Sequence, residues 1–210
     1  MPSTQILKDR ILNTARGTAF AAYTAHLSFS TDIPVFTGSP TATEVTYDTM
    51  ARQPATMAAP TTPAGTTRRS AVSANVVFPT MGGGAGGHVG YGLEYDALTG
   101  GSLLRANVLP DAGAAKTITA ASNATPIVLT IAGHGWASGM FVRVAGVTGN
   151  TAANGLFKII VLTTDTFQLV GSVGNGAYVS GGTATRFGFE IINGIAPQIN
   201  TGQFYSEVAD

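Results

Sequence analysis

The stretch from residue 118 to residue 185 constrains the fold more than any other part of this 210-residue chain. Five short runs of apolar or alternating residues follow one another there, and each is bounded by Gly, Asn, Asp or Ser. The runs cover residues 127–131, 140–144, 155–162, 166–170 and 177–179. Short runs separated by turn-forming residues are typical of consecutive β-strands. The stretch therefore predicts a small all-β module that is complete in itself.

Strand-like sequence lies on both sides of this module. Residues 102–109 form such a run before it, and residues 186–192 form another after it. We therefore predict that residues 117–185 are an insert, a small β-barrel or β-sandwich, in a host domain made of residues 1–116 and 186–210. Lengthening a loop costs only about 0.6 kcal/mol per doubling, so a host fold tolerates such an insertion. The alternative, two domains in tandem, would leave the C-terminal strand as a tail too short to bury its own apolar face.

One helix is predicted, near the N-terminus. Residues 5–16 carry apolar side chains at helical spacing, Ser3 or Thr4 supplies the N-cap, and Gly17 ends the helix. Its apolar side is expected to dock on the host sheet or on a neighbouring subunit. The residues expected at that interface are Ile6, Leu7 and Ile11.

The rest of the host domain follows the period-two pattern of strands. Residues 23–30, 74–79, 88–96 and 103–109 show this pattern, with Gly, Pro or Asn between the runs. The predicted fold class is therefore all-β, with a β-sandwich host domain that also has the N-terminal helix.

Charged residues make up only 10% of the chain, and the formal net charge is zero. A nucleic-acid-binding protein needs a basic footprint, so the composition argues against nucleic acid as a partner. No apolar run is long enough for a transmembrane helix, and residues 1–16 lack the apolar core of a signal peptide. With no cysteine, the chain has neither a disulfide nor a thiolate metal site. We expect a protein that is made in the cytoplasm and has no membrane partner.

Two features deserve comparison with known chemical motifs. The Gly-rich loop at residues 82–87 contains a GxGxxG-type string, but a strand follows it where a phosphate-binding loop requires a helix. We interpret it as a flexible or closely packed connection. Glu94 and Asp96 lie on one face of a strand and paired carboxylates can do acid–base work, but both are expected to flank an exposed turn.

No constellation of catalytic or metal-binding residues is evident. The three histidines, His26, His88 and His134, are each isolated from other ligand-type residues at metal spacing. His134 lies in a Gly-His-Gly turn, where a histidine with satisfied hydrogen bonds is the preferred interpretation. The sequence contains no motif that pairs a nucleophile with a base. We therefore predict a protein that is not an enzyme and has no cofactor.

Two sets of residues are candidates for binding. Residues 52–67 are rich in Ala, Pro and Thr, and the prolines exclude a central strand, so an extended surface segment is expected. The candidate interface residues in it are Arg52, Pro54, Pro60 and Pro63. Trp136 and Tyr178 of the predicted module are possible stacking platforms for a carbohydrate.

Parts of the sequence resemble proteins of bacteriophage particles. In the host domain the resemblance rests on residues 25–30 (AHLSFS), 47–53 (YDTMARQ), 76–79 (VVFP) and 95–104 (YDALTGGSLL), which resemble small β-rich tail fibre or minor tail proteins. The insert resembles a β-module of phage surface proteins. That resemblance rests on residues 122–127 (SNATPI), 133–135 (GHG), 144–147 (VAGV), 150–155 (NTAANG), 166–169 (TFQL) and 174–178 (GNGAY).

The resemblance implies a non-enzymatic structural protein of a tailed-phage virion, made in the cytoplasm of the bacterial host. We favour a head decoration (cement) protein, because the chain lacks the heptads or fibrous repeat of a long shaft. Its expected partners are other copies of itself, as a trimer, and capsid or tail proteins. The alternative is a tail fibre or tail-tip accessory protein whose module binds a receptor or a carbohydrate.

Overall fold

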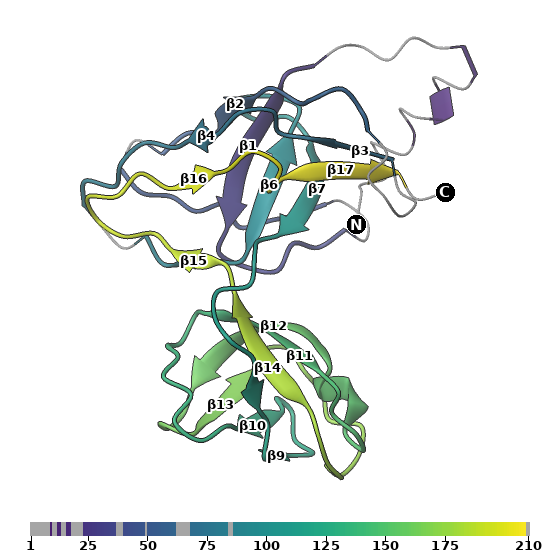
Figure 1. The fold of residues 1–210 in the computed structure, drawn as a ribbon, viewed down its shortest axis with the longest axis vertical. Helices are drawn as coiled ribbons and strands as arrows, with labels where there is room; N and C mark the ends of the chain where they lie inside the picture. The colour runs from purple at the N-terminus through teal and green to yellow at the C-terminus, as the bar shows by residue number, and fades with distance from the viewer. Residues whose placement is uncertain are drawn as a thin grey trace. The chain divides into compact units, whose positions relative to one another are not determined.

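The computed structural model is almost entirely β-structure (Figure 1). It describes residues 9, 12–13, 16–17, 23–36, 40–48, 50–61, 68–83 and 86–208. Within these residues the only helical element that can be delimited is a short 3₁₀ helix, η1 (Thr151–Ala153). The prediction of an all-β chain is confirmed.

The structure does not support the predicted N-terminal helix. Most of residues 5–16 lie outside the described residues, among them Ile6, Leu7 and Ile11. Asp9, Leu12 and Asn13 have helical backbone but are exposed, and Leu12 is 61% exposed. The described residues therefore show no apolar helix face packed on a sheet.

The chain forms two compact units. Unit 1 comprises residues 1–87, 91–109 and 191–210, and unit 2 comprises residues 88–90 and 110–190. Unit 2 is thus almost continuous in sequence, whereas unit 1 is assembled from three segments. The two units divide at residues 109/110 and 190/191, whereas the predicted insert spans residues 117–185, and β14 (Thr183–Phe187) runs past its predicted end.

Unit 1 is built on a four-stranded antiparallel sheet with the order β2-β1-β6-β7 (Figure 1). Its strands are β1 (Ala25–Ser30), β2 (Gln53–Ala55), β6 (Tyr91–Tyr95) and β7 (Leu103–Val108). All five residues of β6 and most residues of β1 and β7 are buried. Because successive side chains of a strand point to opposite faces, both faces of this sheet are covered.

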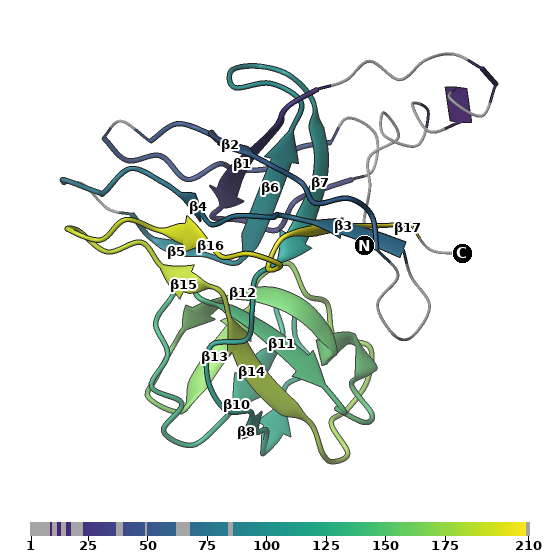
Figure 2. The same ribbon diagram turned by 45° about the horizontal axis from the view of Figure 1, so that its top comes forward.

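Two antiparallel ribbons cover one face of the sheet (Figure 2). They are β3 (Arg68–Ala71) with β17 (Tyr205–Val208), and β4 (Val76–Val77) with β16 (Gln198–Ile199). The ring centroids of Phe29 and Phe78 lie 4.5 Å apart between the layers. At Gly92 a Cβ atom would come 3.0 Å from the Phe204 ring, so this strand position requires a small residue to let the layers close. Phenylalanine packing thus holds the apolar part of the interlayer core together.

An irregular segment, residues 44–48 and 50–52, runs beside β1, and its Glu44 and Arg52 lie on the opposite face of the sheet, at Tyr95. Val45 and Tyr47 are buried there, and the Tyr47 hydroxyl donates to the Pro79 carbonyl at 2.6 Å. Residues 44–48 do not form a strand, and Glu44 makes an isolated bridge to Ser30. Backbone hydrogen bonds to the end of β1, such as that from the Val45 amide to the Phe29 carbonyl at 2.9 Å, and side-chain contacts together anchor this segment.

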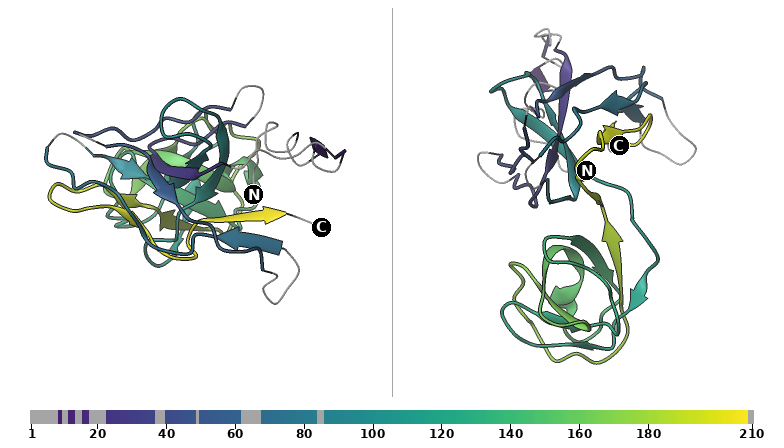
Figure 3. Two further views of the ribbon diagram at one scale, coloured as in Figure 1. Left: turned by 90° about the horizontal axis from the view of Figure 1, so that it is seen from above. Right: turned by 90° about the vertical axis from the view of Figure 1, so that its left-hand side faces the viewer.

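Unit 2 is a small barrel, whose strands can be followed in Figure 3. Its sheet has the order β8-β14-β11-β12-β13-β10-β9. The bounds are β8 (Lys116–Thr117), β9 (Ala120–Ala121), β10 (Val128–Thr130), β11 (Phe141–Ala145), β12 (Gly155–Val161), β13 (Thr166–Leu169) and β14 (Thr183–Phe187). The two outermost strands, β8 and β9, belong to one short stretch of chain.

That stretch, residues 116–121, closes the barrel. Its first half pairs with β14, and the amide of Ile118 continues this ladder to Gly182 at 3.0 Å. Its second half pairs with β10, where the amide of Thr119 bonds the Thr130 carbonyl at 2.9 Å. One segment thus joins both edges of the sheet, and a closed sheet leaves no free edge.

The interior of the barrel is apolar and centred on Phe167, Leu129 and Ile159, which are fully buried. Two strand predictions in this region were wrong. Residues 177–179 form a loop, and residues 186–192 do not form one host strand, because they are divided between β14 and β15 (Phe189–Glu190). Phe187 pairs with Phe141 of β11, so β14 belongs to the barrel.

Unit 2 also contains a two-stranded ribbon, β5 (His88–Val89) with β15, which packs beside Phe141 of β11. Gly90 follows β5, and a Cβ there would lie 2.5 Å from the ring of Phe141. The backbone of this short segment therefore sits directly on an outward-facing aromatic ring, which explains why residues 88–90 group with unit 2.

Candidate functional site

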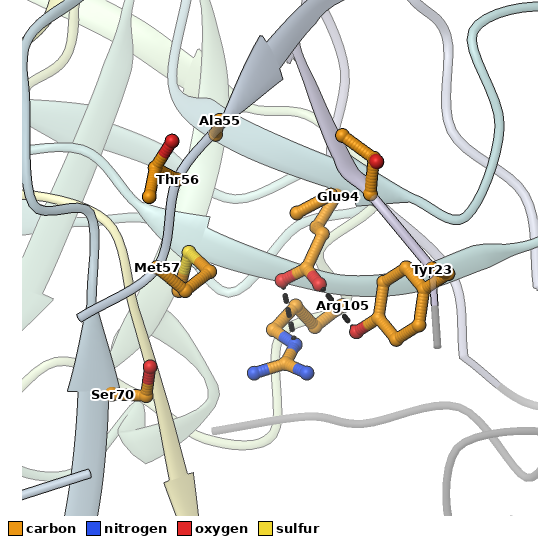
Figure 4. A pocket seen from close by; sticks show the side chains of 9 residues that line it. Tyr23, Ala55, Thr56, Met57, Ser70, Glu94 and Arg105 are labelled. Carbon is orange, nitrogen blue, oxygen red and sulfur yellow. Dashed lines mark hydrogen bonds and ion pairs between the residues drawn. The ribbon is translucent and has the colours of Figure 1, made fainter. Parts of the chain in front are cut away.

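Unit 1 contains a pocket of about 540 Å³ beside a buried ion pair (Figure 4). It lies where the chain crosses from the sheet to the covering layer, since Ala55 pairs with Ala25 of β1 while Met57 pairs with Val72. The lining residues are Tyr23, Thr24, Ala25, Ala55, Thr56, Met57, Ser70, Glu94 and Arg105.

The strand register places the two charges of this pocket together. Glu94 on β6 and Arg105 on β7 are direct cross-strand partners, so both side chains point to the same face of the sheet. Arg105 Nε lies 2.9 Å from Glu94 Oε2, and the two side chains are 8% and 1% exposed. A buried ion pair of this kind is stable only if further hydrogen bonds satisfy both partners.

Glu94 has such a further bond, and Arg105 does not. The hydroxyl of Tyr23 donates to Glu94 Oε1 at 2.8 Å. The contact between Nε and Oε2 is an ion pair whose geometry is not that of a hydrogen bond. No described residue accepts a hydrogen bond from either Nη atom of Arg105, and Figure 4 shows both Nη atoms turned away from Glu94.

Burial raises the pKa of Glu94 above its ordinary value, and the nearby charge of Arg105 and the Tyr23 hydroxyl oppose that rise only in part. This carboxyl group is thus easier to protonate in the fold than in water. The pocket combines a cation whose outer donors are unused with an acid whose charge burial disfavours. Such an arrangement can bind a ligand that offers oxygen acceptors.

The pocket shows no arrangement for covalent catalysis. Ser70 lines it, but its hydroxyl donates to the Ala58 carbonyl at 2.7 Å and no described base contacts it. No group of three metal-ligand side chains occurs in the part of the chain that the structure describes.

The predicted interface residues occupy different environments. Pro54 is exposed in the edge strand β2, and Pro60 is exposed on the extended segment beyond it, which pairs with β3 at Thr61. The described part of this segment runs along strands of its own unit. Pro63, like Ile6, Leu7 and Ile11, lies outside the described residues.

Arg52 is bound within its own unit. Its Nε and Nη2 atoms contact the carboxylate of Glu44 at 3.1 Å and 2.6 Å, and Nη1 donates to the carbonyls of Ala97, at 3.0 Å, and Gly100. The guanidinium carbon lies 3.3 Å from the ring centroid of Tyr95. This side chain therefore fixes residues 44–52 and the 97–100 turn to the sheet.

Trp136 and Tyr178, the predicted stacking residues, are half-buried at the barrel core. The ring of Trp136 lies 5.4 Å from that of Phe167. The hydroxyl of Tyr178 donates to the carbonyls of Ile118 and Gly181 at 3.1 Å and 3.0 Å. Both side chains contribute to the packing of the barrel, and their role in ligand stacking stays a prediction.

Asparagine side chains tie three loops of unit 2 together at one end of the barrel. This loop cluster comprises residues 122–126, 146–154 and 171–182. The principal bonds run from Asn150 Nδ2 to the Ser122 carbonyl at 2.8 Å, from Asn175 Nδ2 to Thr151 Oγ1 at 2.9 Å, and from the Gly176 amide to Asn123 Oδ1 at 3.2 Å. The motifs that carried the resemblance to a phage surface module thus include the residues that build this cluster.

Two sequence features have structural roles. Asp48 accepts hydrogen bonds from the amides of Gly82 and, at 2.8 Å, Gly83, so the protein's own carboxylate anchors the Gly-rich loop. The ring of His134 is buried, accepts from the Trp136 amide at 3.0 Å and contacts the Thr163 carbonyl at 3.1 Å. It is the satisfied turn histidine that the sequence favoured.

Sequence reasoning missed the pocket because it placed Glu94 at an exposed turn, and that placement was wrong. Glu94 is 1% exposed. The available signal was the pairing of opposite charges, Glu94 and Arg105, at positions that a hairpin around residues 96–102 would bring opposite each other.

Two all-β units and a pocket suited to binding define a structural or ligand-binding protein. The model of a family described as podophage GP4 fiber I protein gp80 matches residues 2–126, which is more than half of the chain. The chain belongs to this family of bacteriophage fibre proteins, and the resemblance to phage virion structural proteins is confirmed. Among curated proteins, none matches the chain.

Proposed function

We propose that this protein is a fibre or tail-tip component of a podophage and not a head decoration protein. The observation that carries the proposal is the match of residues 2–126 to a fibre-protein family, a segment that contains most of unit 1. As a member of that family the chain is a structural component of the virion. The family favours the tail over the head decoration role that we expected from the sequence.

In this proposal unit 1 docks on other virion proteins and unit 2 is the insert that projects. The family match covers most of unit 1 and leaves out most of the barrel, whose insertion into a fibre domain is part of the same proposal. With charged residues at 10% of the chain, burying its surface in an assembly desolvates few ions. Self-association, as a trimer, belongs to the same proposal.

The position on the particle is tested by a peptide tag inserted after Ala114, an exposed residue outside the strands. Gold-labelled antibody should mark the tail of tagged particles, with untagged particles as the control. Labelling spread over the head surface would overturn the proposal and restore the decoration role.

Particles that lack the protein separate the two roles by a second readout. They should keep the heat resistance of complete particles and lose adsorption to cells, because a fibre acts at the cell surface. Normal adsorption combined with lower heat resistance would instead indicate a cement protein.

The oligomeric state is tested on the purified chain by light scattering coupled to size-exclusion chromatography. A mass of three chains is expected. A mass of one chain at micromolar concentration would contradict self-association while leaving the location on the tail open to the labelling experiment.

The insertion is tested by replacing residues 110–190 with a short Gly/Ser linker. Unit 1 should remain folded, because its sheet and covering ribbons lie outside the deleted segment. Aggregation of the deletion variant would show that unit 1 requires the barrel.

A further inference from the structure

We propose that the unit 1 pocket binds a ring-bearing carboxylate, such as an acidic sugar, with the carboxylate placed end-on to the Nη atoms of Arg105. The proposal rests on the pocket alone and holds whether the protein acts at the tail or at the head.

The orientation of Arg105 is the first argument. Its Nε edge faces Glu94 at 2.9 Å, so the fork formed by the two Nη atoms is the edge left for a ligand. No described residue accepts a hydrogen bond from this fork, although only 8% of the Arg105 side chain is exposed. These Nη atoms can be reached from the pocket, and a planar carboxylate matches the guanidinium fork with two parallel hydrogen bonds.

The role of Glu94 is the second argument. It holds Arg105 from behind, and the Tyr23 hydroxyl in turn holds Glu94 at 2.8 Å. The guanidinium is therefore fixed in place before a ligand arrives. Preorganised groups of this kind lose little conformational entropy on binding.

The lining of the pocket is the third argument. The side chains of Thr24 and Thr56 make no hydrogen bond to any described residue, so their hydroxyls remain for a ligand. The Ser70 hydroxyl already donates to Ala58, and it can only accept. Tyr23 and Met57 add aromatic and apolar surface, which suits the carbon face of a ring.

The size of the pocket distinguishes a ring-bearing ligand from the side chain of a neighbouring subunit. Its volume of about 540 Å³ falls in the range of small-molecule sites. An aspartate or glutamate side chain inserted from another chain would leave most of that volume empty. We therefore assign the pocket to a small molecule that carries a carboxylate.

Calorimetric titration of the full chain with glucuronate tests the proposal, with glucuronamide and glucose as matched probes that lack the negative charge. Glucuronate should bind saturably, and each uncharged probe should bind at least about tenfold more weakly, because a hydrogen bond to a charged group is lost. Equal binding of glucuronate and glucuronamide, or no binding of either, would overturn the assignment.

Two variants locate the binding. Arg105→Lys keeps the charge but removes the fork, and Thr56→Tyr fills the pocket from its exposed rim without touching the ion pair. Each should weaken glucuronate binding about tenfold or more, while Arg52→Lys on the opposite face of the sheet should not change it. Unchanged binding by a folded Thr56→Tyr protein would place glucuronate elsewhere and refute the proposal.

The same variants would also reveal whether the pocket binds an acidic side chain of a neighbouring subunit. Three results together would indicate this outcome: no free carboxylate binds, the wild-type chain self-associates, and Thr56→Tyr dissociates the oligomer. The pocket would then receive a protein side chain, and the small-molecule assignment would be wrong.

Discussion

Unit 1 contains two arginine–glutamate pairs, on opposite faces of the same sheet, and they differ in how completely the arginine is used. Glu44 and Arg52 lie on the face of Tyr95, whereas Glu94 and Arg105 lie on the other face, since residues 94 and 95 are adjacent in β6. Arg52 contacts a carboxylate and two carbonyls and stacks on a ring. Arg105 contacts one carboxylate, and its outer donors face a pocket.

The number of bonds that each arginine makes separates a structural ion pair from one that could take part in binding. A fully bonded guanidinium has nothing left to offer a ligand, so Arg52 serves as a lock between segments. Arg105 keeps two Nη atoms that no described residue accepts from, and they are not among the fully buried atoms, so they can be reached from the pocket.

Replacing Arg105 with Met should have the largest effect. It leaves the carboxylate of Glu94 buried without its cation, and breaking a buried pair in this way costs about 3–5 kcal/mol. Chemical denaturation monitored by circular dichroism measures the loss in the free energy of unfolding. A loss below about 1 kcal/mol would mean that Glu94 is already neutral or reaches water.

Replacing Arg52 with Met should cost less, about 1–3 kcal/mol, because Arg52 and Glu44 are partly exposed, at 12% and 29%, and Glu44 can recover water. The same denaturation measurement applies. A loss greater than that of Arg105→Met would reverse the comparison between the two faces.

The double variant Glu94→Gln/Arg105→Met should recover most of the stability lost in Arg105→Met, to within about 1–2 kcal/mol of wild type. Removing both charges removes the unpaired buried carboxylate, and replacing a whole buried pair is often close to neutral. Double-mutant analysis of the unfolding free energies gives the coupling. Simple addition of the two single effects would show that the pair does not interact.

The smallest effect is a difference in pH dependence. Burial would raise the pKa of Glu44, but hydrogen bonds from Arg52 and Ser28 and the charge of Arg52 lower it below its ordinary value of 4.5. Its contribution to stability is therefore present above pH 4.5 and lost as the pH falls through the folded-state pKa. For Glu94 the pKa is raised, so its contribution is present below 4.5 and lost as the pH rises through the folded-state pKa.

Two matched variants measure this difference. Relative to wild type, Glu94→Gln should gain stability as the pH rises above 4.5, whereas Glu44→Gln should lose stability over the pH range just below 4.5 as the pH rises. Denaturation curves between pH 3 and pH 7 provide the measurement. Parallel pH profiles for the two variants would show that the two carboxylates share one environment.

Much of the strand content could be predicted from the sequence, because β1, β6 and β7 combine alternation with clear turns on either side. The closure of the barrel could not, since β8 and β9 have only two residues each and show no periodicity. The candidate site was missed for a related reason. Charged residues in a strand usually face water, whereas Glu94 and Arg105 are enclosed by segments distant in sequence, among them Tyr23, Met57 and Ser70 of β3.

The pairing of the two ends of unit 2 has a mechanical consequence for a protein of a fibre family. The first and last segments of the barrel are antiparallel neighbours: the Gly188 amide bonds the Pro110 carbonyl at 2.9 Å, the Ala112 amide bonds the Arg186 carbonyl at 2.7 Å, and β8 then pairs with β14. A force that separates the ends pulls across these bonds one at a time, in the manner of a zipper. Tension applied between residues 110 and 190 would therefore open the barrel progressively from this end. Tension between two points of unit 1 that does not pass through residues 110 and 190 would leave the barrel intact.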